Sequence, residues 1–198
     1  MTALRAGVIG VGHLGQHHAR HYATLPGVTL AGVYDASPDR AKLIAERHGA
    51  KAWTHLADLL KQVDLVSVAA PTSAHFTAAK ACLEAGKHVL VEKPIAVTSA
   101  EARELVDLAA RRGCVLQVGH SERFNPIMQR MRSSIERPAF IEGHRLSAFG
   151  ERGTDVDVVL DLMIHDLDLV LSFHPGPVEE VRAAGVPVLS SNIDIANA

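Results

Sequence analysis

The sequence Gly-Val-Gly-His-Leu-Gly stands at residues 10–15 and forms a G-x-G-x-x-G pattern. In dinucleotide-binding proteins the first glycine of this pattern permits a tight turn, and the second lets the backbone approach a pyrophosphate. The third glycine allows a helix to pack closely on a strand. The N-terminus of that helix offers free N–H groups and a partial positive charge to phosphate oxygens. We therefore expect the phosphates of a dinucleotide to bind at Gly10, Gly12, His13, Leu14 and Gly15.

Asp35 follows the last of these glycines by about 20 residues and comes directly after a β-rich run, Val28–Tyr34. A carboxylate at this place can accept hydrogen bonds from ribose hydroxyls, and it would repel a 2′-phosphate. The sequence therefore favours NAD over NADP as the cofactor. Arg40 is close enough in sequence to leave NADP open. The alternative is a structural glycine turn followed by a turn-forming aspartate.

Three further residues, Lys93, Asp161 and His165, could carry acid–base chemistry. Lys93 follows an apolar run, at the end of a strand where parallel sheets bind ligands, and its ammonium could orient a hydroxyl. Asp161 and His165 are four residues apart, which places them on one face of a helix. The histidine could act as a base near neutral pH, oriented by the aspartate. The alternatives are a surface lysine and an ordinary helical i, i+4 pair.

The histidine spacing raises the question of a metal site. Histidines recur every four residues from His13 to His21, and acidic and histidine side chains share a helical face between Asp161 and Asp168. Such spacing can bind zinc, but the sequence contains no H-E-x-x-H motif, and neither cysteine lies near these residues. We therefore expect solvated or packed histidines and no metal.

Short apolar runs alternate with helical patterns over the first 119 residues, which predicts a parallel sheet of βαβ units in an α/β Rossmann domain. The expected strands are Leu4–Ile9, Val28–Tyr34, Asp64–Ala70, His88–Glu92 and Val115–Val118. The expected helices run from about Leu14 to Leu25, from Pro38 to Gly49, from Ser73 to Gly86, and from Thr98 or Ser99 to Gly113.

The pattern changes after Gly119, and we expect a second, α+β domain over residues 120–198. Asn125 is the expected N-cap of a helix that begins with Pro126. Arg123, just before it, is a candidate substrate-binding residue. The other expected elements are helices through about Ile135 and over Asp157–Phe173, and strands over Ala139–Phe149, Val178–Leu189 and Asn192–Ala198.

Composition excludes several classes of protein. The chain has 198 residues, of which 47% are hydrophobic, and a formal net charge of −2. This balance excludes a strongly basic nucleic-acid binder, and no apolar run approaches the roughly 20 residues of a membrane span. Two cysteines, Cys82 and Cys114, and the lack of an apolar block at the start lead us to expect a cytoplasmic protein.

Three motifs together resemble the Gfo/Idh/MocA oxidoreductases. They are Ala70-Pro71-Thr72 with His75, then Glu92-Lys93-Pro94, and then the D-x-x-x-H formed by Asp161 and His165. Residues 153–157, Gly-Thr-Asp-Val-Asp, further resemble a subgroup that includes UDP-N-acetylglucosamine 3-dehydrogenases.

The resemblance implies a set of site residues. It implies catalytic roles for Lys93, Asp161 and His165, which with Arg123 would also bind the substrate. The cofactor-binding residues that it adds to the glycine turn and to Asp35 and Arg40 are Ala70, Pro71, Thr72, His75, Glu92 and Lys93.

The function that the resemblance implies is NAD-dependent hydride transfer from a secondary alcohol of a sugar, including nucleotide sugars. One alternative is a dinucleotide-binding protein without turnover. Another is a reductase of imines or conjugated double bonds, against which the D-x-x-x-H pair favours alcohol chemistry. Family members are longer and have a broad, mostly antiparallel second sheet, so we expect an incomplete second domain here. We also expect self-association, or poor order beyond about Pro175.

Overall fold

The computed structural model describes residues 3–135, 138–148, 156–173 and 176–198. The chain divides into two compact units, residues 1–119 and 120–198, and each is described by itself.

Six parallel strands form the sheet of the first unit, in the order β3-β2-β1-β4-β5-β6. The chain runs outward from β1 to β3, returns to place β4 beside β1, and then continues to the other edge. This is a doubly wound Rossmann sheet, as predicted, and its order reverses between β1 and β4. The strands are β1 (Leu4–Ile9), β2 (Val28–Tyr34), β3 (Lys51–Trp53), β4 (Leu65–Val68), β5 (His88–Val91) and β6 (Leu116–Val118).

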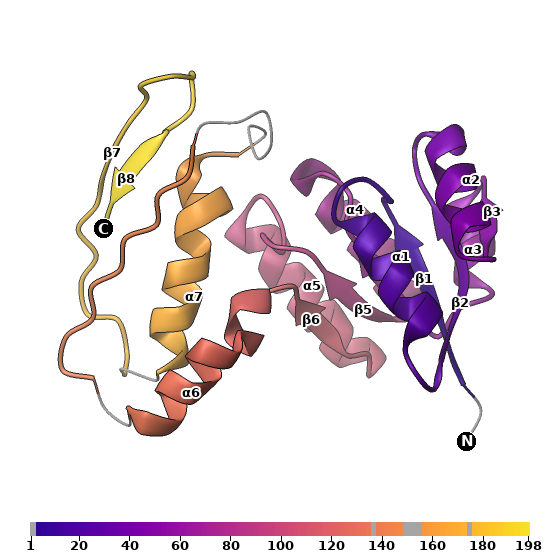
Figure 1. Cartoon of the computed structure of the whole chain (residues 1–198), viewed down its shortest axis with the longest axis horizontal. Helices are drawn as coiled ribbons and strands as arrows, with labels where there is room; N and C mark the ends of the chain where they lie inside the picture. The colour runs from indigo at the N-terminus through magenta and orange to yellow at the C-terminus, as the bar shows by residue number, and fades with distance from the viewer. Residues whose placement is uncertain (1–2, 136–137, 149–155, 174–175) are drawn as a thin grey trace. The chain divides into compact units, whose positions relative to one another are not determined.

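Five helices connect these strands (Figure 1). At the start of one of them, Thr98 and Glu101 form a capping box, as a helix start at Thr98 or Ser99 predicts. In contrast, α4 begins at Thr72 after Pro71, one residue before the predicted start at Ser73. The helices are α1 (Gly15–Thr24), α2 (Pro38–Arg47), α3 (Leu56–Leu60), α4 (Thr72–Glu84) and α5 (Ser99–Arg112).

The core of the first unit consists of two clusters. The inward side chains of α1 and α2 pack with Val8 and Val33 from the sheet. Those of α3, α4 and α5 pack with Ile9, Val66 and Val91. Adjacent residues of β1 therefore belong to different clusters, because successive side chains of a strand point to opposite faces. Helices cover both faces of this sheet, which explains why its strands are continuous apolar runs in the sequence.

The second unit differs from its sequence prediction in its strands. Residues 138–148 have no strand partner among the described residues, so the predicted strand over Ala139–Phe149 is wrong for its described part. Phe140 and Leu146 are 81% and 94% exposed. The sequence of this segment has the apolar pattern of a strand, but a strand also needs a neighbouring strand that pairs with its backbone N–H and C=O groups. The observed strands are shorter than expected and pair antiparallel, β7 (Ala184–Val186) with β8 (Ile195–Asn197).

The helices of the second unit agree better with prediction. A short 3₁₀ helix, η1 (Ser121–Phe124), precedes α6 (Pro126–Ser134), which Asn125 caps by accepting a hydrogen bond from the backbone N of Ile127. The predicted helix over Asp157–Phe173 is present, but it begins as a π-helix, η2 (Val159–Met163), and continues as α7 (Ile164–Ser172). Within the described part of the chain, no helix is long and apolar enough to cross a membrane.

Arg5 and Asp64 form an ion pair that leads to a first prediction. The Arg5 guanidinium and backbone N both donate to the Asp64 carboxylate, and these bonds lower the pKa of Asp64 to about 2. A carboxyl group whose pKa is lowered by folding stabilises the protein above its unfolded pKa and loses that effect as the pH falls toward 2. Asp64→Asn should therefore lower the free energy of unfolding slightly at pH 7, because the pair is about half exposed.

The difference in the free energy of unfolding between Asp64→Asn and the wild type should become smaller as the pH falls from about 4 toward 2. Urea unfolding at pH 7, 4 and 2.5 measures it. A gap that stays constant over this range would contradict the assigned pairing.

Candidate functional site

The turn between β1 and α1 contains the glycine pattern. Gly10 has a φ of +79°, and a Cβ on it would lie 2.7 Å from backbone atoms of Ala70. A Cβ on Gly15 would collide with the carbonyl oxygen of Gly10. A Cβ on Gly12 would meet no atom of the described residues within 4 Å, its chain neighbours aside. The first and third glycines thus permit the turn itself, and the second leaves space for a phosphate against the backbone.

Asp35, directly after β2, is buried, with only 5% of its side chain exposed. Its carboxylate accepts hydrogen bonds from the backbone N of Val11 at 2.8 Å, the backbone N of Ser37 at 2.8 Å, and Nη2 of Arg40 at 3.0 Å. Burial raises the pKa of Asp35, but the hydrogen bonds from Arg40, Ser37 and Val11 outweigh burial and leave it below its ordinary value. The group is therefore an anion with a fixed orientation.

This hydrogen bonding limits what Asp35 can offer a ligand. A carboxylate has about four acceptor positions, and three are used within the protein. One position remains on Oδ2 for a ribose hydroxyl. A second becomes available if Arg40 moves, which is possible because its side chain is 51% exposed. The residues present thus fit a dinucleotide with free ribose hydroxyls.

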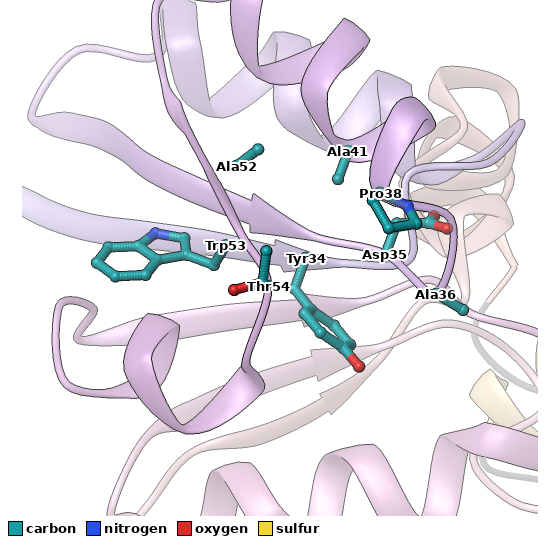
Figure 2. A pocket seen from close by; sticks show the side chains of 8 residues that line it. All are labelled: Tyr34, Asp35, Ala36, Pro38, Ala41, Ala52, Trp53 and Thr54. Carbon is teal, nitrogen blue, oxygen red and sulfur yellow. The ribbon is translucent and has the colours of Figure 1, made fainter.

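A cavity of about 130 Å³ adjoins Asp35. Figure 2 shows Asp35 beside Pro38, while the ring of Trp53 points away from both. The lining combines one carboxylate with mostly apolar side chains, which suits a group with both hydroxyls and a ring. The lining residues are Tyr34, Asp35, Ala36, Pro38, Ala41, Ala52, Trp53 and Thr54.

The segment Ala70-Pro71-Thr72 links β4 to α4, beside the glycine turn. His75 lies one turn into α4 and is 1% exposed. Its two ring nitrogens lie 2.7 Å from the carbonyl oxygen of Pro94 and 2.8 Å from that of Ala70. The sequence predicts a cofactor-binding role for His75, and in the structure both of its ring nitrogens contact backbone carbonyl oxygens.

Glu92, Lys93 and Pro94 directly follow β5. The Glu92 side chain is 14% exposed, and its carboxylate contacts the ring of His18 and the backbone N of Lys93. Burial raises the pKa of Glu92, but hydrogen bonding, first of all from His18, outweighs burial, so the pKa lies below its ordinary value. Lys93 itself is half-buried at the carboxyl end of the sheet, where prediction placed it.

The remaining predicted residues belong to the second unit. Asp161 is the central residue of the π-helix η2, and His165 follows in α7; both are half-buried. π-Helical turns are rare and occur frequently at functional sites. The predicted subgroup motif at residues 153–157 has Gly153, Thr154 and Asp155 outside the described residues.

Arg123 forms a bidentate ion pair that the sequence did not reveal. Its Nε and Nη2 donate to the two carboxylate oxygens of Asp168 at 2.7 and 2.6 Å, and Asp168 is 8% exposed. This pair joins η1 to α7. Prediction made Arg123 a substrate-binding residue, and the structure gives it a partner within the protein. A bidentate pair with a buried carboxylate is well suited to hold the helix that carries His165.

Sequence reasoning also missed His18, Tyr22 and Ser67, which lie between α1 and β4 and connect to Glu92. One feature of the sequence could have indicated the two residues on α1. Gly15, His18, Ala19 and Tyr22 share a helical face, and the buried Gly15 and Ala19 show that this face points inward. Polar side chains on such a face need hydrogen-bonding partners.

A family model described as "Oxidoreductase family, NAD-binding Rossmann fold" matches residues 4–120, more than half of the chain. The chain belongs to the Gfo/Idh/MocA oxidoreductase family. This confirms the predicted family, the predicted fold class and the prediction of NAD as the family's cofactor.

Several Gfo/Idh/MocA relatives match nearly the whole chain. The UDP-N-acetylglucosamine 3-dehydrogenase of Acidithiobacillus ferrooxidans is 42% identical over all of this chain and 63% of its own length. A solved structure of that enzyme has a TM-score of 0.93 over 99% of this chain and 62% of its own. The inositol 2-dehydrogenase of Rubrobacter xylanophilus is 32% identical over 96% of this chain and 58% of its own.

A structure from gentamicin A biosynthesis, in complex with NAD, has a TM-score of 0.83 and is 27% identical over 99% of this chain and 60% of its own. The chain therefore spans about 60% of the length of the relatives it matches.

Asp35 should set the preference of this family member for NAD over NADP. We expect Asp35→Asn to lower the ratio of the NADP to the NAD dissociation constant by about tenfold, because the substitution removes the charge that repels a 2′-phosphate and frees Arg40 to bind it. Titration of both cofactors measures the ratio.

The control for this prediction is the double variant Asp35→Asn with Arg40→Ala. It should lose the gain in NADP affinity. Wild-type protein that binds NADP more tightly than NAD would contradict the assignment.

Proposed function

We propose that the protein transfers a hydride between NAD and a secondary alcohol of a sugar, and that the substrate is a nucleotide sugar. The observation that supports the proposal is that one chain carries three motif elements, each described within its own unit. These are a glycine turn with space for a phosphate, Lys93 at the carboxyl end of β5, and Asp161 with His165 on one helix. The 42% identity to a UDP-N-acetylglucosamine 3-dehydrogenase supports the substrate class.

In the proposed reaction His165 takes the proton of the substrate hydroxyl while a hydride leaves the carbon atom that bears this hydroxyl. Asp161, close by in the preceding turn, orients the substrate hydroxyl or the imidazole. The Lys93 ammonium stabilises the developing alkoxide, since a fixed cation is most effective where negative charge forms. When bound, NAD⁺ supplies the hydride acceptor at its nicotinamide ring.

We also propose that the protein is cytoplasmic and forms homo-oligomers. Both cysteines are free thiols, which supports a reducing compartment. Exposed apolar side chains on α6, with Ile127 at 70% and Met131 at 40%, support self-association. Light scattering measures the mass in solution.

Formation of NADH from NAD⁺, followed by absorbance with a panel of free sugars and UDP-sugars, tests the proposed activity. We expect turnover with UDP-N-acetylhexosamines and much less with the free sugars. NAD binding without turnover on any member of the panel would favour a dinucleotide-binding protein. Turnover only with imines or conjugated double bonds would favour a reductase.

A further inference from the structure

A buried chain of hydrogen bonds runs from α1 to the residue before Lys93. The Tyr22 hydroxyl lies 2.7 Å from Oγ of Ser67 on β4. The same Oγ lies 3.0 Å from Nδ1 of His18, and Nε2 of His18 lies 2.8 Å from Oε1 of Glu92. Ser67 is fully buried, and the His18 side chain is 18% exposed.

The other carboxylate oxygen of Glu92 faces Lys93. Oε2 accepts a hydrogen bond from the backbone N of Lys93 at 3.3 Å. The carboxylate also packs on Gly119, where a Cβ would lie 2.8 Å from Oε2. Each oxygen of Glu92 therefore has a defined partner, and one of these partners is the peptide group that carries Lys93.

Every donor and acceptor in this chain can be satisfied at once. The ionised Glu92 only accepts, so Nε2 of His18 must donate to it. In a neutral imidazole, Nδ1 then accepts from the Ser67 hydroxyl, and Ser67 accepts from Tyr22. Such a directional chain fixes the ring of His18, and through it the carboxylate of Glu92.

The backbone on the far side of Lys93 is held as well. The carbonyl oxygen of Pro94 contacts the buried ring of His75, as described above. Lys93 thus lies between two anchored peptide groups, one supported from α1 and the other from α4. Both helices begin at cofactor-facing segments of the first unit, the glycine turn and residues 70–72.

We propose that His18 is a positioning residue for Lys93 and acts through the Glu92 carboxylate. The proposal rests on the role given to Lys93 under the proposed function. In this proposal α1 has two roles. Its N-terminus faces the phosphates, and its fourth residue, His18, orients the segment that carries the proposed catalytic lysine. Glu92, in this view, supports Lys93 and does not contact the cofactor.

Two amide variants separate this role from simple packing. In His18→Gln the side-chain amide reaches the position of Nε2 and can donate to Glu92. In His18→Asn the amide reaches only the position of Nδ1, so the contact with Ser67 is kept and that with Glu92 is lost. His21→Asn, on the exposed end of the same helix, is the matched control, and Lys93→Ala is the reference for complete loss.

Two measurements are made on every variant: kcat and KM with NAD⁺ and the best UDP-sugar, and hydrogen exchange of the Lys93 amide by NMR. We expect His18→Asn to lower kcat by about 10- to 100-fold, with the KM for NAD⁺ changed less than about threefold. The Lys93 amide should exchange at least about tenfold faster in this variant. His18→Gln and His21→Asn should resemble the wild type in both measurements.

Equal values for the Asn and Gln variants of His18, whether both normal or both reduced, would overturn the proposal. A Lys93→Ala variant with normal kcat would instead refute the catalytic role of Lys93. The exchange of the Lys93 amide would then still decide whether His18 acts on this segment, since that measurement needs no turnover.

Discussion

Lys93→Ala should lower kcat by about 10²–10⁴-fold and leave the NAD dissociation constant within about threefold of the wild type. The physical reason is that, in the proposed mechanism, the ammonium acts on a charge that exists only while the hydroxyl proton and the hydride are leaving. Its removal therefore raises the free energy of the transition state more than that of the bound cofactor. Steady-state kinetics and a separate NAD titration measure the two quantities.

Lys42→Ala is the control for this effect, because Lys42 is exposed on α2 and pairs only loosely with Glu46, at 3.9 Å. It should change neither quantity. His165→Ala should reproduce the loss of kcat. Near-normal turnover in His165→Ala would mean that another group takes the proton.

Gly10→Ala should lower the free energy of unfolding by about 2–4 kcal/mol and weaken NAD binding more than tenfold. Two costs combine at this position. A φ of +79° strains any L residue, and the new Cβ would lie 2.7 Å from the backbone of Ala70. Either the glycine turn or the segment at residue 70 must move, and both belong to the proposed cofactor site.

Gly27→Ala separates these two costs. Gly27 has nearly the same φ, +77°, but a Cβ there would meet no described atom within 4 Å beyond its chain neighbours. In this variant the free energy of unfolding should fall by only about 1–2 kcal/mol, and NAD binding should be unchanged. Urea unfolding and NAD titration of both variants measure the difference. Equal losses in the two proteins would show that the contact with Ala70 is unimportant.

The sequence was sufficient for the parts of the fold that local patterns determine. The glycine turn, the starts of α2, α5 and α6, and the strands β1 and β2 lie where the local residue patterns predict them. The short strand β3 and helix α3 were missed, because elements of three and five residues carry too little periodicity to detect. Residues 139–148 do not form a strand because they have no strand partner among the described residues, and local sequence does not encode such pairing.

Residue types identified the segments of the candidate site but not which atoms face a ligand. His75 and Glu92 stand in motifs that predict cofactor binding, yet both side chains hydrogen-bond to the protein. Arg123 likewise engages Asp168, 45 positions along the chain. Partners so far apart in sequence become visible only when the backbone brings them together.

The π-helix at Val159–Met163 gives the chain one more residue in this turn than an α-helix would have. An α-helical residue turns the chain by about 100°, so deleting one residue between Asp161 and His165 would change the angle between these two side chains around the helix axis. The two side chains would then be three positions apart instead of four, although both residues and the helix would survive. The relative orientation of this acid and this base is therefore adjustable in single-residue steps, by insertion or deletion, without altering either side chain.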